Sequence, residues 1–70
     1  MNIRFIEVTN AYTINRDKMM LSVNGITGFF PNEKNPKKTI LKHISHNNGG
    51  YEVWETPQEI LKLIAQSKGI

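Results

Sequence analysis

Four lysines and two adjacent phenylalanines form the set of side chains best suited to bind a ligand. They are Phe29, Phe30, Lys34, Lys37, Lys38 and Lys42. Lysine ammonium groups neutralise phosphates and exposed aromatic rings stack on bases, which is how small β-barrels hold single-stranded nucleic acid. In the alternative interpretation, the phenylalanines lie in the core and the lysines keep a long loop soluble and protect a sheet edge. The first interpretation predicts an anionic ligand, such as a nucleotide or an oligonucleotide.

The positive charge of the chain is concentrated in the same region. Residues 31–46 contain those four lysines and one acid, Glu33, so the net charge of this segment equals the +3 of the whole chain. A charge of this size attracts anionic partners, but it is also ordinary for a small domain.

The histidines and acids do not form a recognisable catalytic or metal site. His43 and His46 are three positions apart, and on an extended strand such residues point to opposite faces, roughly 10 Å apart. The six acids are scattered; Glu59 fits a helix cap, and Glu52 is predicted to be solvated. The chain has no cysteine and no nucleophile or phosphate-loop motif. We therefore expect no catalytic residue, no metal, no cofactor and no enzyme activity.

Met20 and Trp54 are the candidates for contact with a second copy or with another protein. Met19 and Met20 are adjacent, so in an alternating strand one of them faces away from the core. An outward Met20 near Ile26 or Trp54 predicts an apolar patch used for self-association or for a partner. Trp54 and Tyr51 are also candidates for ligand stacking, with packing at the start of the helix as the alternative.

The length and composition predict one small domain that gains from assembly. Residues 1–70 form a single domain, and a core of this size contributes only about 3–5 kcal/mol. No disulfide is available because there is no cysteine, so self-association into a homo-oligomer is the remaining common device. No apolar run reaches the length of a membrane span and the first residues lack the long apolar core of a signal peptide. We expect a cytoplasmic protein with no membrane partner.

The end of the chain predicts one well-marked helix, over about residues 57–67. Thr56 is a good N-cap, Pro57 suits the first helical position, and Glu59 completes a capping box. After this start, Ile60, Leu61 and Ile64 form an apolar stripe that must be buried. Lys68 and Gly69 are expected at the C-terminal end of the helix.

The rest of the chain predicts about five short antiparallel strands. They are expected at residues 3–8, 12–14, 18–24, 39–45 and 51–54, with the third curling through Gly25 and Gly28 to end at Phe30. A polar loop over residues 31–38 and a turn over residues 46–50 connect the later strands. This is an α+β fold, a curled sheet or small open barrel followed by one C-terminal helix.

Four segments of the chain resemble the flagellar FlbD family and the short FlbD-like proteins of phages and mobile elements. They are residues 3–9, 12–17, 39–41 and 51–60, the last reading Tyr51-Glu-Val-Trp-Glu-Thr-Pro-Gln-Glu-Ile60. The resemblance covers most of the chain and implies a small β-sheet with a C-terminal helix and no catalytic residue. The stretch over residues 25–38 is longer and more basic than the usual link of the family, which favours an element-encoded accessory protein over a flagellar role.

Taken together, the residues predict a small non-enzymatic binding protein. It is expected to act as a homo-oligomer, in stoichiometric amounts, on an anionic ligand such as a nucleotide or a nucleic acid. The alternatives are an adaptor or inhibitor that binds a host protein through an apolar patch, and a flagellar accessory protein.

Overall fold

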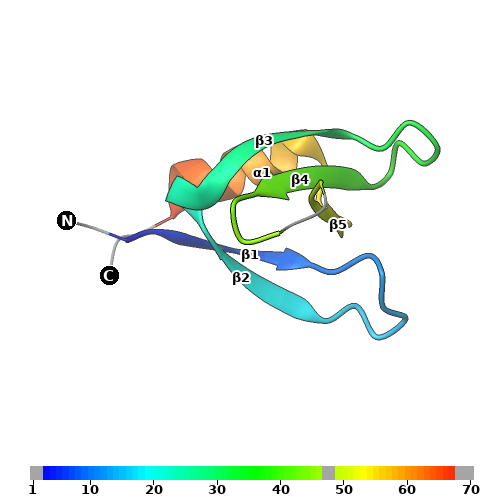
Figure 1. Cartoon of the computed structure of the whole chain (residues 1–70), viewed down its shortest axis with the longest axis horizontal. Helices are drawn as coiled ribbons and strands as arrows, with labels where there is room; N and C mark the ends of the chain where they lie inside the picture. The colour runs from blue at the N-terminus through cyan, green and yellow to red at the C-terminus, as the bar shows by residue number, and fades with distance from the viewer. Residues whose placement is uncertain (1–2, 47–48, 68–70) are drawn as a thin grey trace.

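The computed structural model describes residues 3–46 and 49–67, and it confirms an α+β fold of five antiparallel strands and one C-terminal helix (Figure 1). Strands β1 (Phe5–Thr9) and β2 (Lys18–Ser22) form a two-stranded sheet. Strands β3 (Ile26–Pro31), β4 (Thr39–His43) and β5 (Tyr51–Val53) form a three-stranded sheet in that order. Helix α1 covers Pro57–Gln66. Residues 47–48 of the predicted turn, and Lys68 and Gly69 at the predicted end of the helix, lie outside the described residues.

The first hairpin is simpler than the sequence predicts. β1 pairs directly with β2, with Ile6 opposite Leu21 and Val8 opposite Met19. The short strand expected at residues 12–14 is wrong, because this segment is a series of bends and turns. The Asn10 side chain accepts a hydrogen bond from the Tyr12 backbone N–H (2.8 Å), which turns the chain away from an extended path.

The predicted curl at the two glycines is present, but it divides one expected strand into two. A 3-10 turn over Val23–Gly25 ends β2 and starts β3, so the two strands belong to different sheets. The pairing of β3 with β4 shifts register between Ile26 and Gly28, as a β-bulge does. Position 25 has room only for glycine, since an added Cβ would lie 2.5 Å from the His43 ring.

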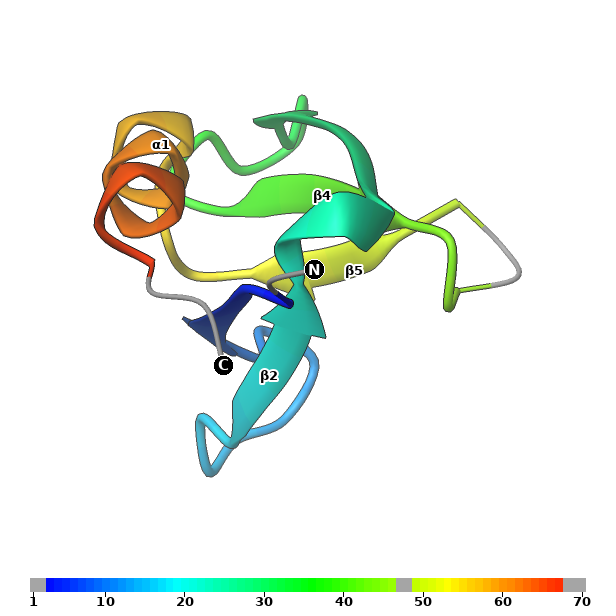
Figure 2. The same cartoon turned by 90° about the vertical axis from the view of Figure 1, so that its left-hand side faces the viewer.

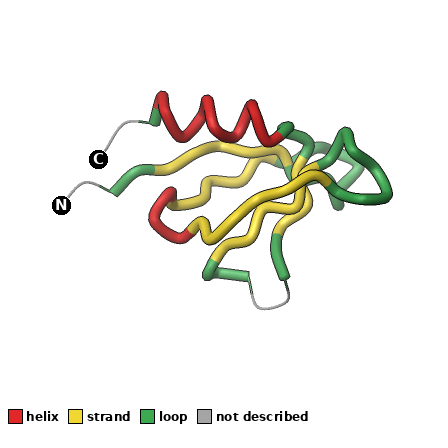
Figure 3. Tube along the Cα trace, turned by 90° about the horizontal axis from the view of Figure 1, so that it is seen from above, coloured by secondary structure: helices red, strands yellow, loops and turns green. Residues whose placement is uncertain are grey.

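One core lies between the two sheets and the helix. Its buried apolar side chains are Ile6, Val8, Leu21, Leu41, Val53 and Ile60. The helix lies to one side of the three-stranded sheet and the two-stranded sheet lies below it (Figure 2). Seen from above, the helix runs alongside the strands (Figure 3), and its main contacts are with β1 and β3. The sheets do not close into a barrel.

The helix confirms its predicted start and corrects its predicted buried face. The capping box is complete: the Thr56 hydroxyl accepts from the Glu59 N–H, and the Glu59 carboxylate accepts from the Thr56 N–H. Ile60 is fully buried, whereas Leu61 is 59% exposed, so its expected burial is wrong. Ile64 packs against the core as predicted, and Leu63 does so in place of Leu61, because positions i, i+3 and i+4 share a helix face and position i+1 does not.

Arg4 joins the beginning of the chain to the end of the helix. Its Nη2 donates to the Ile64 carbonyl (2.7 Å) and its Nε to the Ser67 hydroxyl (2.8 Å). The Ile64 carbonyl also accepts from the Ser67 N–H and hydroxyl, and the Arg4 cation complements the negative end of the helix dipole.

Candidate ligand-binding face

The side of the three-stranded sheet that faces away from the core carries an exposed aromatic ring beside a lysine. The register places Phe30, Ile40 and Glu52 side by side across β3, β4 and β5. They alternate with Phe29 and Leu41, which face the core. Phe30 is 45% exposed, and the Lys42 ammonium lies 5.9 Å from the centroid of its ring. We call this surface the outer face; it consists of Phe30, Ile40, Lys42 and Glu52, with Arg16, Lys38 and Trp54 beyond the end of β5.

Two cations lie over the Trp54 ring at one end of the outer face. The Arg16 guanidinium carbon and the Lys38 ammonium are each 4.8 Å from the ring centroid. The Lys38 ammonium is also 3.5 Å from a Glu52 carboxylate oxygen. Arg16 comes from the distant β1–β2 loop and has a positive φ of 53°, an uncommon conformation for a residue other than glycine. Trp54 therefore holds cations at this face, a use of the aromatic surface that is attractive for Lys and Arg.

The β3–β4 loop is held by the side chain of Asn32. Its amide donates to the Glu52 carboxylate (2.6 Å), and its carbonyl accepts from the Lys34 N–H (2.8 Å). The Asn32 N–H donates to the Lys38 carbonyl (2.9 Å), which closes the base of the loop. Of the three lysines in the loop, Lys34 and Lys37 are exposed and Lys38 is half-buried. The loop thus carries two exposed ammonium groups close in sequence to Phe30, near the end of β3.

The structure gathers part of the predicted site and separates the rest. Phe30, Lys38 and Lys42 belong to the outer face, but Phe29 lies on the core side and packs against the core. The prediction that Glu52 is solvated is wrong. Its side chain is only 16% exposed, accepts a hydrogen bond from Asn32 and forms an ion pair with Lys38. Neither Arg16 nor Asn32 was predicted, because the contact of Arg16 with Trp54 and that of Asn32 with Glu52 depend on the tertiary fold.

The two candidate contact residues lie on different parts of the molecule. Met20 is 60% exposed and lies opposite Glu7 on the two-stranded sheet. Trp54 is half-buried beside the three-stranded sheet, and within the described residues its indole N–H is buried without a hydrogen-bond partner. The apolar patch of Met20 with Ile26 or Trp54 that the sequence suggested is therefore not formed, because Ile26 packs against the core and the Trp54 ring is covered by the Arg16 and Lys38 cations.

His43 is a structural side chain in the described structure. It is buried and its Nε2 lies 2.9 Å from the Ser22 carbonyl oxygen, while its Nδ1 accepts from the Ser45 N–H (3.1 Å). Residues 3–46 and 49–67 contain no group of three or more histidine, cysteine or acidic side chains arranged to hold a metal ion.

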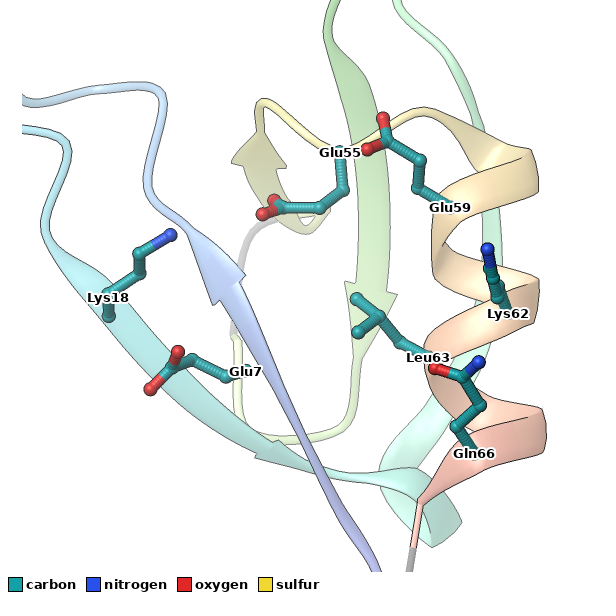
Figure 4. Close-up of a pocket in the computed structure, with 7 residues that line it drawn as sticks. All are labelled: Glu7, Lys18, Glu55, Glu59, Lys62, Leu63 and Gln66. Atoms are coloured by element: carbon teal, nitrogen blue, oxygen red, sulfur yellow. The ribbon is translucent and has the colours of Figure 1, made fainter.

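A second depression, which the sequence did not suggest, lies between the two-stranded sheet and the helix (Figure 4). Its lining residues are Glu7, Lys18, Glu55, Glu59, Lys62, Leu63 and Gln66. Both Glu55 oxygens accept from Thr9, one from its N–H and one from its hydroxyl (2.8 Å each), and Glu59 caps the helix. Two of its three carboxylates thus already serve the fold, which makes this groove a weaker candidate than the outer face.

Comparison with models of protein families, with curated proteins and with solved structures finds no match to the chain. The resemblance to the FlbD family stays a prediction. Among the described residues, no helix has the length and apolar character needed to cross a bilayer.

Proposed function

We propose that the protein is a non-enzymatic binding protein whose outer face takes an anionic ligand with a planar ring, a nucleotide or a single-stranded oligonucleotide. The observation that carries the proposal is the exposed Phe30 ring with the Lys42 ammonium 5.9 Å from its centroid, on an open sheet face.

The two side chains complement the two parts of a nucleotide. Any of the bases can stack on an exposed aromatic ring, and each stack is worth about 1–3 kcal/mol. A lysine beside that ring can neutralise the phosphate of the same nucleotide, and Lys34 and Lys37 on the adjoining loop supply further charge for a longer strand.

The pairing of Glu52 determines which lysine of the outer face is available for a phosphate. Its carboxylate is paired with Lys38 and Asn32, so it repels phosphates less than an unpaired carboxylate would. Lys38 is correspondingly committed to Glu52 and Trp54, whereas Lys42 makes its one described contact with a ring. We therefore assign the phosphate contact to Lys42 before Lys38.

The single tryptophan of the chain supports a direct binding test. Oligothymidylate and a mononucleotide are titrated separately while Trp54 emission and fluorescence anisotropy of labelled ligand are followed. We expect saturable binding that Phe30→Ala weakens by about 1–3 kcal/mol. Log affinity falls as log salt concentration rises, and we expect Lys42→Ala to make this slope less steep by about 0.7.

Two matched substitutions control this experiment. Lys62→Ala removes the same charge from the groove beside the helix, and Leu61→Ala removes an exposed apolar side chain from the helix. Both are expected to bind like the unsubstituted protein. Equal losses in all four variants, or no binding at low salt, would contradict the proposal. Binding of the oligonucleotide but not of the mononucleotide would identify a polymer as the ligand.

A protein partner is the second candidate function, because the β1–β2 loop exposes two apolar side chains. Tyr12 is 66% exposed and Ile14 is 99% exposed. Such exposure at a loop tip is typical of residues that bind a partner. A partner captured equally well by the Lys42→Ala variant and lost with Ile14→Ser would favour this function.

A further inference from the structure

The outer edge of β2 offers backbone hydrogen-bonding groups to another strand. β2 pairs with β1 alone among the described strands. The bonds from the Asn10 N–H to the Asp17 carbonyl and from the Val23 N–H to the Arg4 carbonyl fix the alternation of this ladder. Met19 and Leu21 therefore bond to β1, and the N–H and C=O groups of Lys18 and Met20 point away from it.

We propose that two copies of the chain pair through this edge, antiparallel, about a twofold axis at Met19, forming a continuous four-stranded sheet. In this register Lys18 of each copy faces Met20 of the other. Each such pair exchanges two backbone hydrogen bonds, because both residues direct their N–H and C=O groups to the open edge.

The other symmetric registers are blocked by features of the structure. An axis at Met20 would use the Ser22 carbonyl, which already accepts a bond from the buried His43 ring (2.9 Å). An axis at Lys18 would require Arg16 to be extended, but its φ is 53°. Axes between two residues would pair an outward-directed backbone group with an inward-directed one. An axis at Leu21 would pair Met20 with Ser22 and would use the same Ser22 carbonyl. The axis at Met19 is the one that uses only Lys18 and Met20, whose outward-directed backbone groups make no described bond.

The side chains of the proposed register are complementary. Lys18 of one copy would lie against Met20 of the other, and its methylene groups would cover a side chain that is 60% exposed in the single chain. Beyond Met20 lies Glu7 on β1, two strand spacings of about 4.8 Å away, within the reach of a lysine. In the single chain the Lys18 ammonium donates to the Thr9 hydroxyl (2.7 Å), so in the dimer each Lys18 would exchange this bond for a contact with the partner's Glu7.

The pairing uses a short strand, so the dimer is expected to be weak and concentration-dependent. Interfaces below about 1,200 Å² are typical of transient complexes. The proposal is independent of ligand binding, because the β2 edge belongs to the two-stranded sheet and the outer face belongs to the other sheet. Substitutions at Phe30 and Lys42 are expected to leave the dimer unchanged.

Cross-linking through introduced cysteines tests the register, since the chain has none of its own. In the proposed dimer, Lys18 of one copy and Met20 of the other are directly opposed, at about 5.5 Å between Cα atoms, within the range of a disulfide. Two copies of the same position, Lys18 with Lys18 or Met20 with Met20, are offset by two residues and lie more than about 7 Å apart.

We therefore expect a 1:1 mixture of Lys18→Cys and Met20→Cys proteins to form a disulfide dimer that neither variant forms alone. Met19→Cys alone is expected to cross-link, although Met19 is less exposed than Met20. Leu61→Cys, with a similarly exposed position on the helix, controls for random collision.

Equal cross-linking of Met20→Cys alone and of the mixture would overturn the register. A sedimentation mass of one chain at several hundred micromolar would overturn the dimer itself. Met20→Lys would place a lysine opposite Lys18 of the other copy, so we expect it to weaken the dimer. An assembly that persists unchanged in this variant would show that another surface is used, and it would also overturn the proposal.

Discussion

His43 shows how one buried side chain connects the two sheets. A carbonyl can only accept, so the 2.9 Å contact with the Ser22 oxygen requires the proton on Nε2, and the Nδ1 lone pair is then free to accept from the Ser45 N–H. The ring thus joins the end of β2 to the end of β4. Gly25 provides the space for it, because any Cβ at that position would lie 2.5 Å from the ring.

Substitutions at these two positions are expected to be costly and coupled. His43→Ala leaves buried polar groups unpaired and a cavity, and should lower the free energy of unfolding by about 2–4 kcal/mol. Gly25→Ala should cost about 1–3 kcal/mol by displacing the ring. The loss of unfolding free energy in the double variant should be smaller than the sum of the two single losses, because the ring that the added methyl group would displace is already gone. Urea midpoints measure all three.

Lys42→Ala is the control for the His43 cycle, as an exposed neighbour on the same strand with an expected change within about 0.5 kcal/mol. Strictly additive losses at positions 25 and 43 would show that the ring contact is not what restricts position 25 to glycine.

At the scale of the elements, the helix depends on its cap and on a narrow buried face. The capping box sets the first turn, so that Ile60 projects into the core between the sheets, where it is fully buried. The adjacent Leu61 lies about 100° further round the helix and is largely solvent-exposed. Sequence alone identified the helix and its start because caps are local signals, but it could not choose among adjacent apolar residues.

Truncation of the two neighbouring residues should therefore have unequal effects. Ile60→Ala is expected to lower the free energy of unfolding by about 2–5 kcal/mol, the range for a buried isoleucine. Leu61→Ala should change it by less than about 0.5 kcal/mol, because the side chain is already mostly in water and alanine favours helix. Thermal denaturation followed by far-UV circular dichroism compares them, and comparable losses would mean that the helix is rotated from the orientation described.

The strands show a similar division between what is local and what is not. Alternation correctly indicated β1, β2 and β4, and the glycines correctly indicated a bulge. The division of residues 18–30 between two sheets was not predicted, because the 3-10 turn over Val23–Gly25 is favoured by the His43 contact from β4. The segment over residues 12–14 has strand-like residues but forms turns, since β1 finds its partner in β2 instead.

At the scale of the whole molecule, both sheets and the helix share a single core. Val8 from the first sheet, Leu41 from the second and Ile60 from the helix belong to the same buried cluster. Neither sheet has a separate core among the described residues, and a two-stranded sheet alone is marginal in water. The two sheets are therefore expected to unfold together.

A single cooperative transition checks this expectation. Emission from Trp54 reports on the region beside β5, and far-UV circular dichroism reports chiefly on the helix. At a concentration where the chain is monomeric, the two midpoints in urea should coincide. A Trp54 transition that clearly precedes the loss of helix would show that the three-stranded sheet opens independently.

The candidate site was predicted as a region rather than as a set of contacts. The density of lysines after Phe30 was sufficient to place a basic surface near β3 and β4. It could not distinguish Phe30 from Phe29, because the two differ only in which side of the strand they occupy, and that is set by the pairing of Phe29 with Leu41.

The sequence by itself determined the fold class, the helix with its cap, and the position of the basic segment, because capping, alternation and charge are properties of neighbouring residues. The tertiary structure decided which aromatic ring faces solvent, that Arg16 and Lys38 lie over Trp54, that Glu52 is paired, and that the β2 edge is open. Those outcomes depend on strand register and on contacts between segments far apart in the chain, which no local pattern encodes.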